Sequence, residues 1–207
     1  MGLMDIETEF SINTMIEKYN PHTIIIYGSR ARGDATAESD VDLVCFLDST
    51  LEFEDTRNVN GIFIDAWIYP TTSMNNINDF IKLNNAYCAV DKLGLGKKLL
   101  SKVAKAYKKG PIPLSRDNKM NIVELGNKNL QQSDKGDLEG NFRKVRLQSD
   151  LLQTYFLLRD MWYLGPKHSF SWLKENDLIA LELFKSTYEE PQNIEKLNQL
   201  AAFVMNK

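Results

Sequence analysis

Two aspartates separated by a single residue, Asp40 and Asp42, are the side chains of this sequence best suited to chemistry. They stand at the start of the apolar run over residues 41–47, which predicts a β-strand. Side chains alternate across a strand, so both carboxylates point to the same side and lie close together. Carboxylates held this close repel each other unless a cation lies between them, and oxygen ligands of this kind suit Mg²⁺. The pair therefore predicts a divalent-metal site.

A turn suited to phosphate precedes the two acids. Residues 23–27 form an apolar, β-branched run typical of a buried strand, and Gly28 and Ser29 follow it directly. Glycine lets the backbone approach a ligand closely, while serine offers both a hydroxyl and an N–H group. A phosphate-binding turn next to a metal site is the arrangement needed for phosphoryl or nucleotidyl transfer.

A third carboxylate, Asp65, lies in the middle of the strand-like apolar run over residues 61–69. Burying a single carboxylate in such a run is costly unless it is paired or coordinated. If this strand lies beside the one that carries Asp42, Asp65 completes a triad able to hold two Mg²⁺ ions. Two metals can stabilise the attacking and leaving oxygens of an in-line displacement at phosphorus.

Together these residues resemble the nucleotidyltransferase superfamily that includes DNA polymerase beta. The resemblance rests on the Gly-Ser turn, on Gly33, on the Ser-Asp-x-Asp sequence that begins at Ser39, and on the later Asp65. It covers residues 23–69, about a quarter of the chain. Within the superfamily it is closest to the small bacterial minimal nucleotidyltransferases and to kanamycin nucleotidyltransferase-like enzymes.

The resemblance implies a role for each motif residue. In that family the first two acids bind both metals, the third orients the attacking hydroxyl, and the Gly-Ser turn grips the triphosphate. The implied catalytic and metal-binding residues are Asp40, Asp42 and Asp65, and the implied nucleotide-binding residues are Gly28, Ser29, Arg30 and Ser39. The expected enzyme uses two Mg²⁺ ions to move a nucleoside monophosphate from an NTP, expected to be ATP, to a hydroxyl acceptor with release of pyrophosphate.

Each motif also has a simpler structural interpretation. Gly28 and Ser29 suit an ordinary strand-to-helix turn, and Ser39 suits a cap or turn. Asp65 also fits a core acid that is bonded to Arg30 or Arg32. The joint occurrence of all the motifs in this order favours the metal site over these separate interpretations.

The composition is that of an ordinary globular protein. Of 207 residues, 43% are apolar and 26% are charged, and the net charge is −3. The negative balance argues against a general nucleic-acid-binding surface. No apolar run reaches the length of a membrane span, and the N-terminus lacks a signal-peptide pattern. Cys45, expected in a buried strand, and Cys88, expected in a helix, lack zinc-ligand spacing, which predicts a reducing, cytoplasmic location.

The chain is predicted to be an α+β protein of two domains. Residues 1–110 are expected to form the nucleotidyltransferase domain, a mixed sheet flanked by helices. An amphipathic helix is expected over residues 5–19, and a polar loop over residues 49–60. From residue 73 to about residue 110 the pattern is helical, and the lysines of its last part are interpreted as a solvated face rather than a nucleic-acid site.

Residues 111–207, after a Gly-Pro break, are expected to form a helical bundle on the acceptor side. The predicted helices cover residues 119–132, 137–164, 172–184 and 193–205. The arrangement resembles that of kanamycin nucleotidyltransferase, which implies that the bundle builds one wall of the acceptor pocket and supplies a general base. The sequence does not choose among the candidate bases Glu124, Glu139 and Asp150.

Two further expectations concern the second half and its partners. Arg159, Trp162 and Lys167 resemble a short motif of some relatives, although Trp162 also fits a core position and Arg159 an ion pair with Asp160 or Glu175. The alternative function is an antitoxin-like nucleotidyltransferase that binds or modifies a partner protein or RNA. Neither a membrane nor nucleic acid is expected as a partner. The sequence does not decide whether the chain forms a homodimer.

Overall fold

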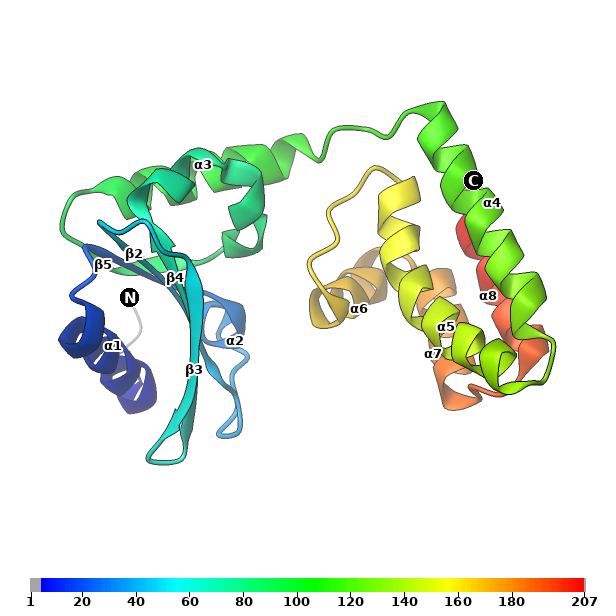
Figure 1. Ribbon diagram of the computed structural model, residues 1–207, viewed down its shortest axis with the longest axis horizontal. Helices are drawn as coiled ribbons and strands as arrows, with labels where there is room; N and C mark the ends of the chain where they lie inside the picture. Colours follow the sequence, from blue (N-terminus) through cyan, green and yellow to red (C-terminus); the bar gives the residue numbers. More distant parts are fainter. Residues whose placement is uncertain (1–4, 207) are drawn as a thin grey trace. The chain divides into compact units, whose positions relative to one another are not determined.

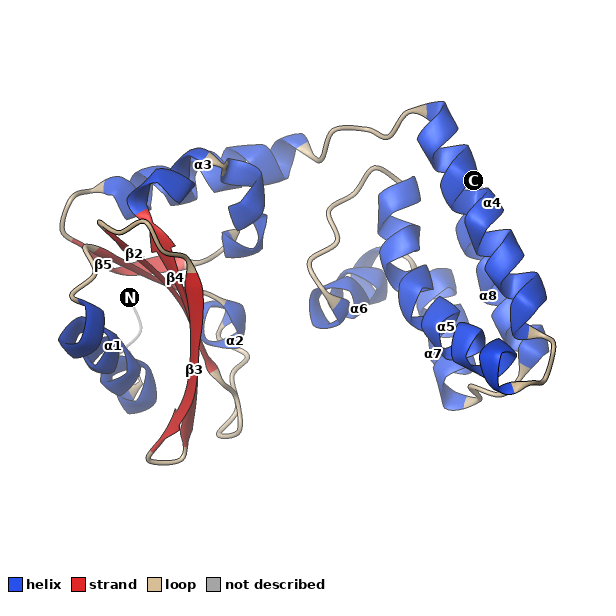
Figure 2. Cartoon of the chain, in the orientation of Figure 1, coloured by secondary structure: helices blue, strands red, loops and turns tan. Residues whose placement is uncertain are grey.

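The computed structural model describes residues 5–206 and divides the chain into two compact units, residues 1–109 and residues 110–207 (Figure 1). The first unit holds a five-stranded sheet with flanking helices, and the second consists of helices (Figure 2). The predicted α+β class is confirmed. Each unit is described by itself below.

The first unit alternates helices and strands. Its α-helices are α1 (Ile6–Tyr19), α2 (Gly28–Arg32) and α3 (Leu95–Lys109), and two 3₁₀ segments are η1 (Thr71–Asn75) and η2 (Ile77–Leu83). Its strands are β1 (Thr23–Ile26), β2 (Val41–Leu47), β3 (Phe53–Val59), β4 (Ile62–Pro70) and β5 (Tyr87–Asp91). They follow the order β3-β4-β2-β1-β5, with β2 and β4 parallel and the other neighbours antiparallel. The sheet is therefore mixed.

Side-chain alternation divides the strands between two cores. Val41, Leu43 and Cys45 of β2 pack with Ile12 and Met15 of α1 on one face. On the other face Val44 and Phe46 pack with residues of η1, η2 and α3. Asp5 is the N-cap of α1, and its carboxylate accepts a bond from the Thr8 N–H at 2.8 Å. The first core thus leaves the second face of the sheet to carry the polar residues of β2 and β4.

Two strands of this unit differ from the predicted elements. β3 lies within the predicted loop over residues 49–60, and β5, which carries Cys88, lies within the segment predicted to be helical. β3 is a polar edge strand, paired with β4 through a tight turn at Asn60 and Gly61, whose φ angles are 56° and 85°. Its polarity reflects exposure at the edge rather than absence of structure. η1 and η2 also replace the α-helix expected from residue 73.

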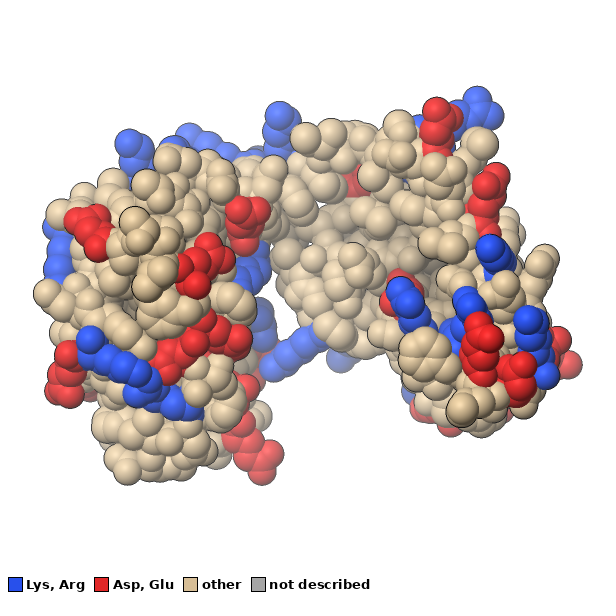
Figure 3. Space-filling view, in the orientation of Figure 1, with Lys and Arg blue, Asp and Glu red and all other residues tan. Residues whose placement is uncertain are grey.

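The helix α3 presents its lysines to solvent. Its six lysines are exposed: Lys97, Lys98, Lys102, Lys105, Lys108 and Lys109. Figure 3 shows basic side chains along the upper edge of this unit, where Figure 1 places α3. Leu99 and Val103 on the opposite side of the helix are buried against the sheet. This arrangement agrees with the interpretation of a solvated lysine face.

The second unit contains five helices within the described residues, where four were predicted. They are α4 (Arg116–Ser133), α5 (Leu138–Leu158), α6 (Pro166–Asn176), α7 (Leu178–Glu189) and α8 (Ile194–Met205). α5 ends before Asp160, which has a φ of 54°, rather than running to residue 164. Asp177 ends α6 and caps α7 by accepting a bond from the Ala180 N–H at 3.0 Å, which splits the helix predicted over residues 172–184.

The core of the second unit surrounds Tyr155 of α5. Its ring packs against Phe156 and Phe184, and its hydroxyl donates to Asp177 at 2.6 Å. The guanidinium of Arg159 lies over the ring at 3.8 Å from its centroid. Among the described residues, no helix combines the length and apolar character that crossing a membrane requires.

Candidate active site

Asp42 and Asp65 lie side by side on neighbouring strands. They are register partners in the parallel pairing of β2 with β4. Both occupy the sheet face opposite α1, because their neighbours Val41, Leu43, Ile64 and Ala66 fill the core beneath α1. The adjacency on which the predicted triad depended is therefore present.

The environment of the two acids disfavours negative charge unless a cation is added. Burial raises the pKa of Asp42 to about 6, with further contributions from Asp65 and Asp40. Burial and then Glu54 raise the pKa of Asp65. The Oδ1 atom of Asp65 is buried and has no hydrogen-bond partner among the described residues. A carboxylate oxygen left without a partner in a polar cluster is what a bound cation would satisfy.

Asp40 is the exposed member of the three acids, and its charge acts on both Asp42 and Asp65. It precedes β2 and its side chain is exposed, although it is close enough to raise the pKa of Asp42. Within residues 5–206, no three side chains of His, Cys, Asp or Glu form a ready metal-binding group. The donor chemistry of Asp42 and Asp65 fits a hard divalent cation such as Mg²⁺, and a third carboxylate would have to turn toward them.

Gly28 packs directly against the carboxylate of Asp42. A Cβ atom at position 28 would lie 1.9 Å from Asp42 Oδ2, and the residue has a φ of +69°. Both observations require glycine. The Tyr27 N–H donates to the Asp42 carbonyl at 3.2 Å, which joins the end of β1 to the start of β2. The predicted turn and the predicted acid are thus in contact.

Ser29, predicted to bind the nucleotide, is buried in the first turn of α2 and directly follows Gly28. Its carbonyl accepts bonds from the Gly33 N–H at 2.9 Å and the Asp34 N–H at 3.1 Å. Gly33 ends this short helix with a φ of +81°. The turn is therefore closed at both ends by glycines in the left-handed region.

Arg30 is engaged by protein groups rather than directed at the acid pair. Its side chain is only 5% exposed and pairs with the carboxylates of Asp5, at 2.7 Å, and Glu7. It also donates to the carbonyl oxygens of Ser39, at 2.9 Å, and Asp40, at 3.2 Å. These bonds tie the segment before β2 to the start of α1. The geometry differs from the expected phosphate contact, since the guanidinium donors are already in use.

Ser39 likewise organises its own loop. Its hydroxyl accepts a bond from the Thr36 N–H at 2.9 Å, and its carbonyl accepts from Arg30. Of the seven residues implied by the resemblance, the structure gathers Gly28, Asp42 and Asp65. The others lie in the adjoining turn and loop, where they shape the backbone.

Lys82 is a site residue that sequence reasoning missed. Its ammonium donates to the Tyr27 hydroxyl at 3.3 Å and lies 5.3 Å from the centroid of the Trp67 ring. Burial lowers its pKa, while Asp65 and Asp42 act in the opposite direction. The signal available in the sequence was a single lysine between the apolar residues Ile81 and Leu83. Glu54 of β3 also raises the pKa of Asp65. No signal in the sequence marked Glu54, because it lies in the predicted loop.

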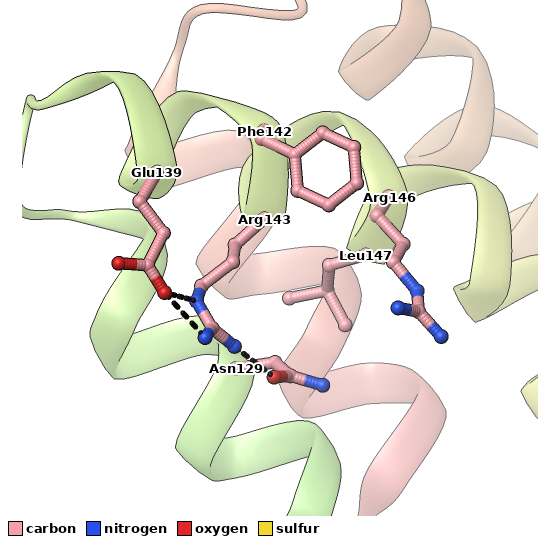
Figure 4. Close-up of a pocket in the computed structure, with 6 residues that line it drawn as sticks. All are labelled: Asn129, Glu139, Phe142, Arg143, Arg146 and Leu147. Atoms are coloured by element: carbon pink, nitrogen blue, oxygen red, sulfur yellow. Dashed lines mark hydrogen bonds and ion pairs between the residues drawn. The ribbon is translucent and has the colours of Figure 1, made fainter.

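The acids considered as general bases in the second unit are surface residues. Glu139 accepts from Arg143 at 2.6 Å, Asp150 pairs with Arg146 at 3.4 Å, and Glu124 is exposed. Figure 4 shows Glu139 and Arg143 with Asn129 at a small pocket between α4 and α5, with a volume of about 270 Å³. Within residues 5–206 the contacts of these three acids do not distinguish one of them as a base.

Arg159 belongs to the core of the second unit. Besides lying over the Tyr155 ring, it donates to the carbonyl oxygens of Tyr155 at 3.2 Å and of Val204 at 3.4 Å. It thereby links the end of α5 to α8. Its contacts with a ring and with backbone carbonyls give Arg159 a structural role in this unit.

Comparison with known proteins gives a family and a distant structural likeness. Residues 11–102 match the family described as Polymerase beta, Nucleotidyltransferase, a span that contains the turn, both acid-bearing strands and Lys82. The crystal structure of a nucleotidyltransferase-like protein from Exiguobacterium sibiricum 255-15 is similar with a TM-score of 0.45 and 10% identity, over 96% of this chain and 73% of that chain. No curated protein matches the sequence.

Proposed function

The N-terminal unit belongs to the nucleotidyltransferase superfamily, and from this premise we propose that the protein is a Mg²⁺-dependent nucleotidyltransferase. It moves a nucleoside monophosphate from an NTP, with ATP as the expected donor, to a hydroxyl acceptor. The observation that carries the proposal is the register pairing of Asp42 with Asp65 next to Gly28. An acid pair of this kind against a glycine turn suits a metal-bound triphosphate better than a core contact.

Asp42 and Asp65 would hold the metal, with Asp40 turning in from the start of β2. The buried Oδ1 of Asp65 and the repulsion felt by Asp42 support this assignment. Bound Mg²⁺ would neutralise the triphosphate and stabilise charge on the attacking and leaving oxygens. Two ions are proposed, in keeping with the three acids of the resemblance.

The other residues would bind and orient the substrates. The Gly28 turn and the first N–H groups of α2 would receive the β- and γ-phosphates. Asp65 would orient the acceptor hydroxyl and accept its proton. The hydroxyl oxygen then bonds to the α-phosphorus, the bond from that phosphorus to the bridging oxygen breaks, and pyrophosphate leaves with the electron pair. Arg30 and Ser39 would keep Asp40 at the edge of the site through the loop that they brace.

The proposal assigns a different role to each half of the chain. Residues 1–110 would be the catalytic domain, and residues 111–207 would be the acceptor-side bundle. Cys45 and Cys88 are both free thiols, which suits the proposed reducing cytoplasm.

The test is an acceptor screen with labelled ATP and Mg²⁺, scored by pyrophosphate release. Asp42→Asn and Asp65→Asn should each lower turnover by at least about a hundredfold, because removing one electrostatic group commonly costs that much. Asp48→Asn is the matched control, since Asp48 is an exposed acid just beyond the opposite end of β2. Turnover that survives in both site variants would refute the assignment.

A partner-binding function has one observation in its favour. Leu138, Phe142 and Val145 form an apolar stripe at helical spacing on α5, and they are 88%, 65% and 60% exposed. Such a stripe suits a partner protein, as the antitoxin-like alternative requires. Co-purification of a helical partner that is lost with Phe142→Ser would support this alternative, and a solitary protein that turns over small acceptors would count against it.

A further inference from the structure

The buried neighbours of Lys82 in η2 fix the position of its backbone. Phe80, Ile81 and Leu83 are 1%, 3% and 1% exposed, and the ring of Phe80 lies 5.3 Å from that of Phe46 in β2. Side chains this deeply packed fix the backbone between them. The lysine therefore extends from a rigid segment over the sheet face that carries the acids.

The aromatic contacts of Lys82 locate its ammonium at the acid pair. Trp67 is two residues from Asp65 along β4, and therefore on the same face of the sheet. Tyr27 immediately precedes Gly28, which contacts Asp42. The Lys82 ammonium lies 4.8 Å from the Tyr27 ring centroid and 5.3 Å from that of Trp67. It thus stands beside both parts of the site, the phosphate turn and the acids.

The ammonium retains capacity for a ligand. It carries three donors, and among the described residues its hydrogen bond goes to the Tyr27 hydroxyl. The aromatic faces supply attraction without using an N–H. Asp65, Asp42 and Glu54 offset part of the unfavourable burial of its charge. A partly buried cation with donors to spare, at a site for an anionic substrate, suits the oxygens of a phosphate group.

We propose that Lys82 binds the triphosphate of the nucleotide, and that in the nucleotide-free protein it serves as the cation facing Asp42 and Asp65. This inference rests on the proposed function and adds a substrate-binding residue to it. The lysine and the metal both attract the triphosphate. They compete for the carboxylates of Asp42 and Asp65, because each positive charge repels the other.

Removing the lysine charge should therefore change the affinities for the nucleotide and for the metal in opposite directions. Lys82→Met should weaken binding of a non-hydrolysable Mg–ATP analogue by roughly tenfold to a hundredfold, the loss expected for a charge-assisted hydrogen bond. The same variant should bind Mn²⁺ alone several times more tightly, because a positive charge next to the carboxylates has been removed. A lysine that only supported the fold would weaken both.

The experiment measures both affinities by calorimetry, with Mn²⁺ alone and with the Mg–ATP analogue. Lys92→Met is the matched control, because Lys92 follows β5 at the end of the sheet remote from Asp42 and bonds to Asn20. It should change neither affinity. Lys82→Arg keeps the charge and tests the site if the methionine variant does not fold; it should restore most of the analogue affinity and leave Mn²⁺ affinity near that of the unaltered protein.

Failure of this inference and failure of the proposed function give different results. If Asp42→Asn abolishes Mn²⁺ binding, but Lys82→Met changes both affinities in the same direction or neither, the role of Lys82 is wrong and the metal site stands. If Asp42→Asn leaves Mn²⁺ binding unchanged, the metal site itself is wrong. Tighter Mn²⁺ binding together with weaker analogue binding supports both.

Discussion

Replacing Gly28 by alanine should disturb the candidate site more than any other single-methyl addition in its turn. The added Cβ would lie 1.9 Å from Asp42 Oδ2 and 2.8 Å from Asp42 Cγ. Real Cβ atoms essentially never lie within 3.0 Å of another atom in this way, so the carboxylate must rotate away. The residue must also keep a φ of +69°, which side chains of L-amino acids rarely adopt.

The two penalties can be estimated separately. An alanine in the left-handed region is destabilised by about 1–2 kcal/mol relative to glycine. Forcing a methyl group into an occupied space adds about 1–3 kcal/mol. Gly28→Ala should therefore lower the free energy of unfolding of the first unit by about 2–5 kcal/mol. Because Asp42 has moved, it should also lower metal affinity by about tenfold or more, which corresponds to about 1.4 kcal/mol.

Gly33→Ala is the matched control at the other end of the same short helix. Its φ is +81°, and nothing lies within 4 Å of a Cβ added there. It should show the backbone penalty alone, about 1–2 kcal/mol, and keep its metal affinity. Hydrogen exchange of the amides of β1 and β2 measures the local free energy of opening in each variant. Mn²⁺ titration measures the affinity.

The difference between the two variants is the decisive quantity. If Gly28→Ala destabilises β1 and β2 no more than Gly33→Ala, the close packing of Gly28 on Asp42 does not exist in solution. If Gly28→Ala is destabilised but binds Mn²⁺ as tightly as Gly33→Ala, Asp42 is not a metal ligand. Either result would refute the inference that Gly28 positions Asp42 for metal binding.

Three other perturbations test the surroundings of the site and the second unit. Arg30→Lys should lower local stability around Ser39 by about 1–3 kcal/mol in hydrogen exchange, because a lysine cannot reproduce its bonds, whereas the more exposed Arg32→Lys should change little. In the metal-free protein the raised pKa of Asp42 means that the folded state keeps this proton to a higher pH than the unfolded state does. Urea titrations should show the free energy of unfolding falling by about 1 kcal/mol, after solvent screening, as pH rises from about 4 to about 6. The fall should be smaller in Asp42→Asn, where only the raised pKa of Asp65 contributes to it. Tyr155→Phe should lower the stability of the second unit by about 1–2 kcal/mol, and ultraviolet titration should detect the ionisation of Tyr155 only near pH 12, since burial and the bond to Asp177 raise its pKa to about 12.

The acids of the site could be predicted because their signals are local. A carboxylate within an apolar run is unusual wherever the run folds, so Asp42 and Asp65 stood out. That β2 and β4 are neighbours could only be assumed, because parallel pairing joins segments that are far apart in sequence. The sequence also could not show that Asp40 is exposed and that the three acids do not form a ready metal-binding group among the described residues, since this depends on the loop before β2.

Elements were missed where a tertiary environment outweighs the local pattern. β3 reads as a loop because an edge strand tolerates polar side chains, and its partner β4 supplies the apolar half of the hairpin. The helix predicted over residues 172–184 is divided because Asp177 serves both as the end of α6 and as the cap of α7. Apolar periodicity continues across this boundary, so it gives no sign of the break.

Arg30 and Lys82 show that distance from a motif along the sequence does not indicate how a cation is used in the fold. Arg30 follows the turn directly, and its position alone suggested a phosphate contact. Its guanidinium is nevertheless used by acceptors of α1 and of the loop before β2, which it holds together. Lys82 is remote in sequence, but η2 carries it to the acid face with donors still available. If the proposed role of Lys82 is correct, the hydrogen bonds that a cation already makes within the protein indicate better than its distance from a motif in sequence whether it can bind the substrate.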